Sequence, residues 1–296
     1  MTESLVTSSR ASFPGVARQP VVPHAVQPAT EPKVTVVIPA KNEADSLPHV
    51  LSSLPTGLHQ VIVVDGGSTD GTTDVARRFV GVTVIGQTRT GKGNALACGF
   101  AVATGDFIVM LDADGSTDPG EIPHFVEALA RGVDFAKGSR SLEGGGSSDL
   151  SLFRRVGNFG LNKIVNLIYG TRYTDLCYGY NAFRRECLEA IDLEPGEKVG
   201  LEADGPDGMR WGDGFEVETL IHIRVAKAGL KVLEVPSFER TRLFGRSNLH
   251  AVSDGIRVLR CIRTERKRQQ AASNPMGQRE QLTAWPLLSN CAEEAS

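Results

Sequence analysis

Short apolar runs alternate with amphipathic stretches through the first half of the chain. Each run is rich in β-branched residues, has the length of a buried strand and stops at a proline, a glycine or an acidic residue. The strands predicted in this way span residues 34–38, 61–64, 82–85 and 107–111. Between them we expect a helix that begins near Asp45 or Ser46, one that is capped by Thr69 or Asp70, and one over residues 93–103. This alternation predicts βαβ units and an α/β fold with a mostly parallel sheet.

The second half of the chain is less regular. Its pattern predicts helices over residues 121–131, 155–169, 215–228 and 249–267, and strands over 134–137 and 231–235. The glycine-rich segment 144–148 is expected to be a flexible loop, and the strand 231–235 is expected to lie at an edge of the sheet. The last helix combines an apolar stripe with several arginines, so it is amphipathic and basic.

The hydrophobic periodicity, where it is present and where it is absent, divides the chain into four segments. Residues 1–32 and 269–296 lack a consistent period, and we expect a disordered leader and a disordered tail. Residues 33–250 are expected to form one domain, a mostly parallel sheet sandwiched by helices. Residues 251–268 form the basic amphipathic helix, which either lies on an anionic membrane surface or packs on the domain with a solvated basic side.

Composition narrows the class of protein. Among 296 residues, 32 Lys and Arg stand against 35 Asp and Glu, and a net charge of −3 argues against a nucleic-acid partner. No run of about 18 apolar residues occurs, which argues against a membrane-spanning helix. Five scattered cysteines without a CxxC pair predict reduced thiols in the cytoplasm. We therefore expect a cytoplasmic protein that is at most peripheral on the membrane.

Acidic and glycine-rich segments follow the predicted strands, at the edge where open α/β sheets bind ligands. Asp112 and Asp114 come directly after an apolar strand, and two carboxylates at this spacing can share one divalent cation. Such a cation would stabilise a diphosphate as a leaving group. Residues 39–43 and 65–71 close the first two strands, where a nucleoside would lie. Each segment alone could be a turn or a helix cap, but their order at successive strand ends favours a site.

These motifs, taken together, resemble those of glycosyltransferase family 2. The segments that carry the resemblance are residues 36–43, 63–72, 91–96 and 110–114. Later segments resemble the dolichyl-phosphate mannose synthase subgroup, and they are residues 137–140, Asp175 with 179–185, 215–218 and 228–236. The resemblance covers about residues 33–250. It implies a single catalytic domain of the GT-A, Rossmann-like fold that inverts the sugar and uses Mg²⁺ or Mn²⁺.

The resemblance also implies roles for single residues. Nucleotide-sugar binding is expected of Pro39, Glu43, Asp65, Lys92 and Asp112, and cation binding of Asp112, Asp114 and Ser116. Three positions depart from the family pattern. Ser116 stands where the subgroup often has glutamine, Gly66 replaces the second aspartate of the usual motif, and Asn248 replaces a lysine. The last departure weakens any inference about donor or acceptor specificity, but it leaves the cation motif intact.

Arginines at loop positions and helix starts suit a phosphate acceptor, because a guanidinium matches phosphate oxygens. The candidates are Arg140, Arg154 and Arg242, and Arg140 is expected to be catalytic together with Asp114. A phosphate is already anionic and needs little help from a general base. If the acceptor is instead a hydroxyl, Glu216 or Asp213 is the candidate base. Glu216 and Glu218 lie two positions apart at a helix start, so only one of them can face the cleft.

The expected reaction moves a hexose from a nucleotide diphospho-sugar to a polyprenyl or dolichyl phosphate. GDP-mannose is the first choice of donor and UDP-glucose is the second. The expected partners are therefore a nucleotide sugar, a polyprenyl phosphate, and a membrane surface or a membrane-anchored protein. One alternative is a family 2 enzyme that acts on a soluble hydroxyl acceptor. Another is a nucleotidyltransferase or a non-catalytic binder of nucleotide sugars.

Overall fold

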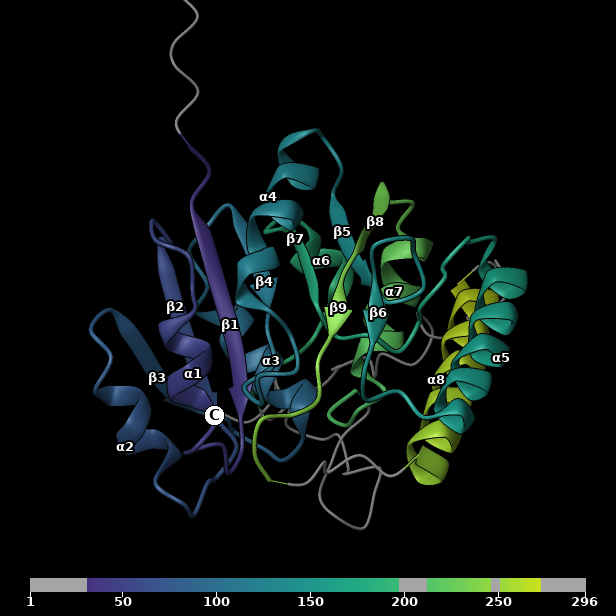
Figure 1. Ribbon diagram of the computed structural model, residues 1–296. Coiled ribbons are helices and arrows are strands. Elements are labelled where there is room, and N and C mark those ends of the chain that lie inside the picture. Colours follow the sequence, from purple (N-terminus) through teal and green to yellow (C-terminus); the bar gives the residue numbers. More distant parts are fainter. Residues whose placement is uncertain (1–30, 197–211, 246–250, 273–296) are drawn as a thin grey trace, which may run out of the picture. The chain divides into compact units, whose positions relative to one another are not determined.

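A seven-stranded sheet with the strand order β3-β2-β1-β4-β7-β5-β8 forms the centre of the molecule (Figure 1). The computed structural model describes residues 31–196, 212–245 and 251–272. The strands of the large sheet are β1 (Val34–Ala40), β2 (Gln60–Asp65), β3 (Val82–Gly86), β4 (Phe107–Met110), β5 (Phe135–Ser139), β7 (Asn181–Arg184) and β8 (Val232–Pro236). A second, small sheet pairs β6 (Gly146–Ser147) with β9 (Phe238–Glu239).

The large sheet is mostly parallel, which confirms the α/β prediction. β1 pairs in parallel with β2 and β4, β2 pairs in parallel with β3, and β5 pairs in parallel with β8. β7 lies between β4 and β5 and pairs antiparallel with both. The carboxyl ends of β1 and β4 therefore lie side by side, where these two inner strands end. β8 is the outermost strand on one side of the sheet, as expected.

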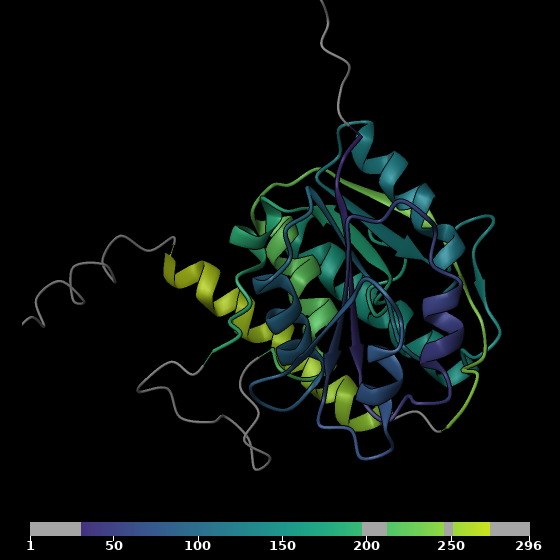
Figure 2. The ribbon, with the colours of Figure 1, turned by 90° about the vertical axis from the view of Figure 1, so that its left-hand side faces the viewer.

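Helices cover both faces of this sheet (Figure 2). They are α1 (Leu47–Ser52), α2 (Thr72–Arg77), α3 (Lys92–Ala101), α4 (Ile122–Ala130), α5 (Leu152–Tyr169), α6 (Cys187–Ile191), α7 (Val217–Lys227) and α8 (Ala251–Ala272). Successive side chains of a strand point to opposite faces. Val36 and Ile38 of β1 accordingly join the core under α1 and α4, whereas Val37 joins the core under α3 and α7. The apolar runs of the sequence thus form strands that pack against helices on both faces of the sheet.

A third apolar core joins α5, α7 and α8. Val165 of α5, Leu220 of α7 and Val258 of α8 are among its buried members. Glu265 of α8 also binds Lys227 of α7 with a distance of 2.8 Å between the ammonium and the carboxylate. The middle of α8 therefore packs on the domain, which was one of the two expectations for this helix. None of the helices in the described ranges has the length and apolar character needed to cross a bilayer.

Several predicted boundaries need correction. α2 is preceded by Gly71 in a left-handed conformation rather than capped by Thr69 or Asp70, although the Asp70 carboxylate still accepts from the Thr72 amide. α5 begins at residue 152, three residues early, because the Ser151 hydroxyl accepts from a first-turn amide. The expected flexible loop at 144–148 contains β6. The pattern also missed β7, α6 and β9, which are short.

Candidate active site

A cavity of about 1220 Å³ begins at the carboxyl ends of β1 and β4 and extends to α5 and α8. Most of the predicted site residues line it, and these are Pro39, Glu43, Lys92, Asp112, Asp114, Ser116, Arg140, Arg154 and Arg242. Asp65 and Glu216 do not line it. Side chains that are far apart in the sequence therefore meet in one place, at the sheet edge where the pattern predicted a ligand site.

The loop after β4 holds Asp112 and Asp114 at the cavity wall. The Asp114 carboxylate accepts a hydrogen bond from the Ser116 amide at 2.9 Å, so its own loop fixes it. Gly115 between them has a φ of 75°, and a Cβ at this position would meet Leu243 at 2.4 Å. Only glycine fits this close approach without a shift of its neighbour. The Leu243 amide in turn donates to the Asp114 carbonyl at 3.1 Å, which joins the loop to the segment after β9.

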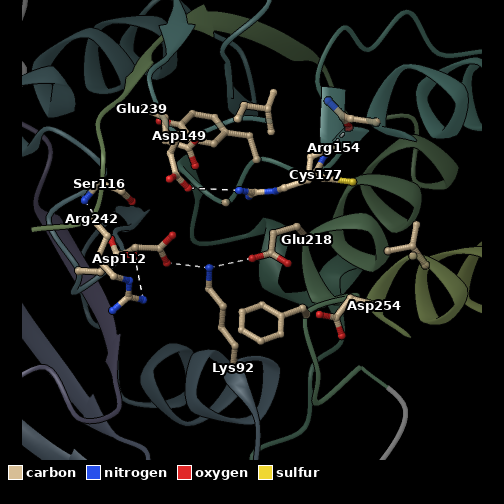
Figure 3. A pocket seen from close by; sticks show the side chains of 18 of the residues that line it. Lys92, Asp112, Ser116, Asp149, Arg154, Cys177, Glu218, Glu239, Arg242 and Asp254 are labelled. Carbon is tan, nitrogen blue, oxygen red and sulfur yellow. Dashed lines mark hydrogen bonds and ion pairs between the residues drawn. The ribbon is translucent and has the colours of Figure 1, made fainter. Parts of the chain in front are cut away.

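Lys92 lies between two carboxylates at the centre of the charged part of the cavity (Figure 3). Its ammonium is 2.7 Å from Asp112 and 2.8 Å from Glu218. Burial lowers the pKa of Lys92, but the two carboxylates outweigh burial and raise the pKa above its ordinary value. Burial raises the pKa of Glu218, and Lys92 opposes this effect. Lys92 thus carries its positive charge beside the first aspartate.

Arg242 occupies an equivalent position beside the second aspartate. Its guanidinium is 3.1 Å from Asp114 and 2.5 Å from Glu43. Burial raises the pKa of the Glu43 carboxyl, and Arg242 acts in the opposite direction. Arg242 is one of the residues expected to contact the acceptor phosphate, and the structure places it against Asp114 in the loop after β4, away from Arg140 and Arg154 in its ion pairs.

The donor set of this loop fits a hard divalent cation. Asp112 and Asp114 offer carboxylate oxygens, and Mg²⁺ is typically held by one or two carboxylates together with the phosphates of its substrate. No larger group of histidine, cysteine and acidic side chains that could hold a metal is found in the part of the chain that the structure describes. The two aspartates therefore fit a cation that a bound diphosphate would help to hold. Ser116 is buried beside them and adds a hydroxyl to the cavity wall.

Arg140 requires a correction, because its guanidinium is already bound on both edges. Asp175 accepts from Arg140 Nε and Nη2 at 2.7 and 2.8 Å, and Glu239 accepts from Nη1 at 2.9 Å. The side chain also lies over the ring of Tyr178, 4.6 Å from its centre. Burial raises the pKa of Asp175, but Arg140 outweighs burial and lowers it to about 2. The Arg140 side chain is almost fully buried, and a carboxylate accepts from each of its three guanidinium nitrogens, so this geometry opposes the predicted acceptor role.

Arg154 is better placed to meet an acceptor. It lies in the first turn of α5, lines the cavity, and pairs with Asp149 at 3.2 Å while about a quarter of its side chain stays exposed (Figure 3). From this point the cavity wall changes character. Its remaining part runs between α5 and α8 and is lined by apolar side chains, namely Phe153, Val156, Leu161, Ile164, Ile256, Val258 and Leu259. We refer to this part, lined by those seven residues, as the apolar groove.

Three helical glycines also line the apolar groove. Gly157 and Gly160 lie in α5 and Gly255 lies in α8, and a Cβ at any of them would meet no atom of the described residues within 4 Å. Glycine inside a helix costs about 1 kcal/mol relative to alanine. No neighbouring atom demands glycine at these positions, so their effect is to keep the groove wide.

The candidate bases also occupy different places from those expected. Glu216 lies outside the cavity lining and accepts from the Gly214 amide, whereas Glu218 faces the cavity. The Asp213 carboxylate is held by Arg89 through two contacts of 2.7 and 2.9 Å. Sequence spacing indicated that only one of the two glutamates faces the cleft. α7 begins at Val217, two residues after the predicted start, and Glu218 rather than Glu216 lines the cavity.

Asp65 is the other predicted residue outside the cavity lining. Its carboxylate accepts from the amides of Gly67 and Ser68, at 3.1 and 3.2 Å, and so it organises the loop after β2. The neighbouring Gly66 does line the cavity. Asn248, the third departure from the family pattern, lies outside the described residues.

Comparisons with known proteins identify the family of this chain. The family model described as Glycosyl transferase family 2 matches residues 35–192. An undecaprenyl-phosphate mannosyltransferase from Micrococcus luteus is 32% identical over 241 residues, which cover 78% of this chain and 93% of the relative. A polyprenol monophosphomannose synthase from Mycolicibacterium smegmatis is 31% identical and covers 77% of this chain and 84% of its own.

A solved structure supports the fold. Glucosyl-3-phosphoglycerate synthase from Mycobacterium tuberculosis, in complex with Mn²⁺, uridine diphosphate and glucosyl-3-phosphoglycerate, superposes with a TM-score of 0.57. The match covers 79% of this chain and 80% of that one at 23% sequence identity. This likeness concerns the fold alone, and it agrees with the GT-A architecture expected from the motifs.

Proposed function

The chain belongs to glycosyltransferase family 2, and from this premise we propose that it transfers a hexose from a nucleotide diphospho-sugar to a polyprenyl phosphate. The transfer would invert the configuration at the anomeric carbon and would depend on one divalent cation. Membership of this family sets aside a nucleotidyltransferase.

One observation carries the choice of acceptor: a single cavity joins a charged end to the apolar groove. A polyprenyl phosphate has the same two parts, a phosphate head and an unsaturated hydrocarbon tail. The head would lie near Arg154, where the two parts of the cavity meet. The tail would lie between α5 and α8, where the width left by Gly157 and Gly160 admits a branched chain. Apolar contact with the groove would then stabilise the complex in proportion to the area buried.

The charged end suits the donor. Asp112 and Asp114 would hold the divalent cation, which supplies positive charge to the leaving diphosphate. Lys92 and Arg242 lie within 3.1 Å of these aspartates, so their N–H groups are within reach of the same phosphate oxygens. Pro39 at the end of β1 would contact the nucleoside, together with the loop that Asp65 organises.

The acceptor phosphate would attack the anomeric carbon directly. A new bond forms between that carbon and a phosphate oxygen, while the bond to the diphosphate oxygen breaks. The nucleophile is already anionic at neutral pH, so no side chain has to remove a proton. The start of α7 is consistent with this, because Glu218, which lines the cavity there, is bound to Lys92. A hydroxyl acceptor would instead need that carboxylate free to accept a proton.

The names of the relatives favour mannose as the sugar, so GDP-mannose is the first donor to test and UDP-glucose is the second. A polyprenyl phosphate resides in a membrane, and the proposed reaction therefore takes place at a membrane surface, with the protein peripheral on the cytoplasmic side. Exposed apolar residues on α5 support this placement, among them Leu152, Phe153, Val156 and Phe159. A membrane-anchored partner would serve the same purpose.

The test incubates the purified full chain with polyprenyl phosphate, Mn²⁺ or Mg²⁺, and labelled GDP-mannose or UDP-glucose in parallel. We expect label in the organic phase from one donor, lost on removal of the cation and lost in Asp114→Ala. Asp118→Ala is the matched control, since this aspartate lies in the same loop region but outside the cavity lining. Slow hydrolysis of a donor without lipid labelling would instead indicate a water-soluble acceptor.

A further inference from the structure

The charged end of the cavity repeats one arrangement twice. Each of two basic side chains bridges one aspartate of the proposed cation site to one glutamate outside that site. They are Lys92, between Asp112 and Glu218, and Arg242, between Asp114 and Glu43. Each aspartate thus has a positive partner within 3.1 Å, and the two partners come from different segments of the chain.

Backbone packing fixes where the Lys92 side chain starts. Lys92 is the first residue of α3, and the next residue, Gly93, donates its amide to the Asp213 carbonyl at 2.7 Å. A Cβ on Gly93 would come within 1.7 Å of the Gly212 carbonyl oxygen, so this contact admits no other residue. The start of α3 is therefore joined to the segment that leads into α7 and Glu218. The ammonium can turn between neighbours, but its backbone and its glutamate partner keep their places.

We propose that Lys92 and Arg242 are exchangeable counter-cations of Asp112 and Asp114. A divalent cation displaces them from the aspartates, each keeps its contact with its glutamate, and both direct N–H groups to the diphosphate of the donor. The inference rests on the proposed function only for the donor end of the cavity. It assigns Glu218 and Glu43 as the residues that retain the displaced groups.

The arrangement has a consequence for binding. A divalent cation that arrives alone must compete with two positive side chains for the same carboxylates, which weakens its binding. A diphosphate gives the displaced ammonium and guanidinium new negative partners and adds oxygens to the cation. The cation therefore promotes binding of the nucleotide, and by linkage the nucleotide promotes binding of the cation by the same factor.

The experiment measures Mn²⁺ binding to the full chain, by calorimetry and by the electron paramagnetic resonance signal of free Mn²⁺, with and without GDP or UDP. For the unchanged protein we expect one of these nucleotides to tighten Mn²⁺ binding at least tenfold. In Lys92→Met we expect Mn²⁺ alone to bind several-fold more tightly, because a competing charge is gone. The same variant should bind the nucleotide at least tenfold more weakly. A side chain that only supports the fold would not give these opposite signs.

Arg242→Met should shift both affinities in the same directions, and it decides the question if thermal melting shows that Lys92→Met is unfolded. Arg240→Met is the matched control, because Arg240 pairs with Asp118 at 2.7 Å outside the cavity lining. Weaker binding of Mn²⁺ alone in the folded variants would overturn the inference. The inference would also be overturned if the nucleotide tightened Mn²⁺ binding in the folded variants as much as in the unchanged protein. It would be overturned as well if the unchanged protein bound neither GDP nor UDP. No lipid acceptor is present, so failure of the proposed acceptor would appear separately, in the labelling experiment.

Discussion

The buried contact between Arg140 and Asp175 tests whether Arg140 supports the fold or binds the acceptor. Asp175 is fully buried and accepts four hydrogen bonds, three from Arg140 and one from Asn158. Asp175→Asn keeps the size of the side chain but removes its charge. The substitution also places an amide, which donates, where a carboxylate accepted. The variant therefore isolates the electrostatic part of the contact.

The pKa of Asp175 sets the scale of the effect. Burial raises this pKa and Arg140 lowers it, with the net result that it falls from 3.8 to about 2. That difference corresponds to about 2 kcal/mol in favour of the folded, ionised state. Breaking a buried ion pair by removing one partner commonly costs about 3–5 kcal/mol. Glu239 still neutralises part of the Arg140 charge, so we expect a loss of about 3 kcal/mol in the free energy of unfolding.

Urea unfolding at several pH values measures this loss. The folded pKa lies below the unfolded one, so ionised Asp175 stabilises the protein fully above about pH 4. Its contribution then declines as the pH falls toward 2. The difference between the wild type and Asp175→Asn should therefore be largest near pH 7 and about half as large at pH 3. Asp149→Asn breaks an exposed pair with Arg154 and should cost less than about 1 kcal/mol.

Two results would refute this reasoning. Equal stability of Asp175→Asn and the wild type at pH 7 would show that the buried pair is not stabilising. A several-fold lower KM of the folded variant for the acceptor would show that Arg140, once released, binds phosphate. We expect instead that the variant keeps the wild-type KM at low temperature and that Arg154→Met raises it, because Arg154 faces the cavity with one exposed pair.

Three further predictions follow from other parts of the structure. Gly160→Leu should not destabilise α5, because the added side chain enters open space. In a chain-length series, it should raise the KM for long polyprenyl phosphates several-fold more than the KM for a ten-carbon analogue. Burial holds the pKa of His222 well below its ordinary value, so the folded state binds fewer protons than the unfolded state. The free energy of unfolding should therefore fall below pH 6.5 by up to about 1.4 kcal/mol per pH unit. Chemical denaturation of His222→Gln should show a flatter pH dependence. Phe159→Ser replaces an exposed apolar residue of α5 and should reduce sedimentation with anionic vesicles without changing donor hydrolysis.

The first half of the fold could be predicted because its strands are buried on both faces. A parallel strand between two helical layers has an almost continuous apolar sequence, and β1 is such a strand, with each residue from Val34 to Ile38 buried. β7 could not be found in this way. It has four residues, begins with Asn181 and ends with Arg184, and it is a strand because β4 and β5 pair with it. Those contacts form only in the folded chain.

In the candidate site, the positions of residues at strand ends could be predicted, but the contacts between distant side chains could not. Strand ends are local features, so Asp112 and Asp114 could be placed at the edge of the sheet from their spacing. The partner of an arginine is not local, and Arg242 meets Glu43 across 199 positions of sequence. Sequence alone therefore could not separate Arg140, which two carboxylates already bind, from Arg154, which faces the cavity. The choice between Glu216 and Glu218 depended on the exact start of α7, and the pattern placed that start two residues early.

The two ends of the cavity come from parts of the chain that differ in their relation to the family. The charged end is built mainly by the ends of β1 and β4 and the start of α3, all of which fall within the residues matched by the family model. The apolar groove needs α8, which lies outside that match. Glu43, Lys92, Asp112 and Asp114 thus lie in the part matched by the family model, and Glu218 and Arg242 complete the charged end from outside it. The width and the apolar lining of the groove depend on how α8 packs against α5 and α7. Substitutions that change the acceptor without changing the donor should therefore be found at the contact between α5 and α8.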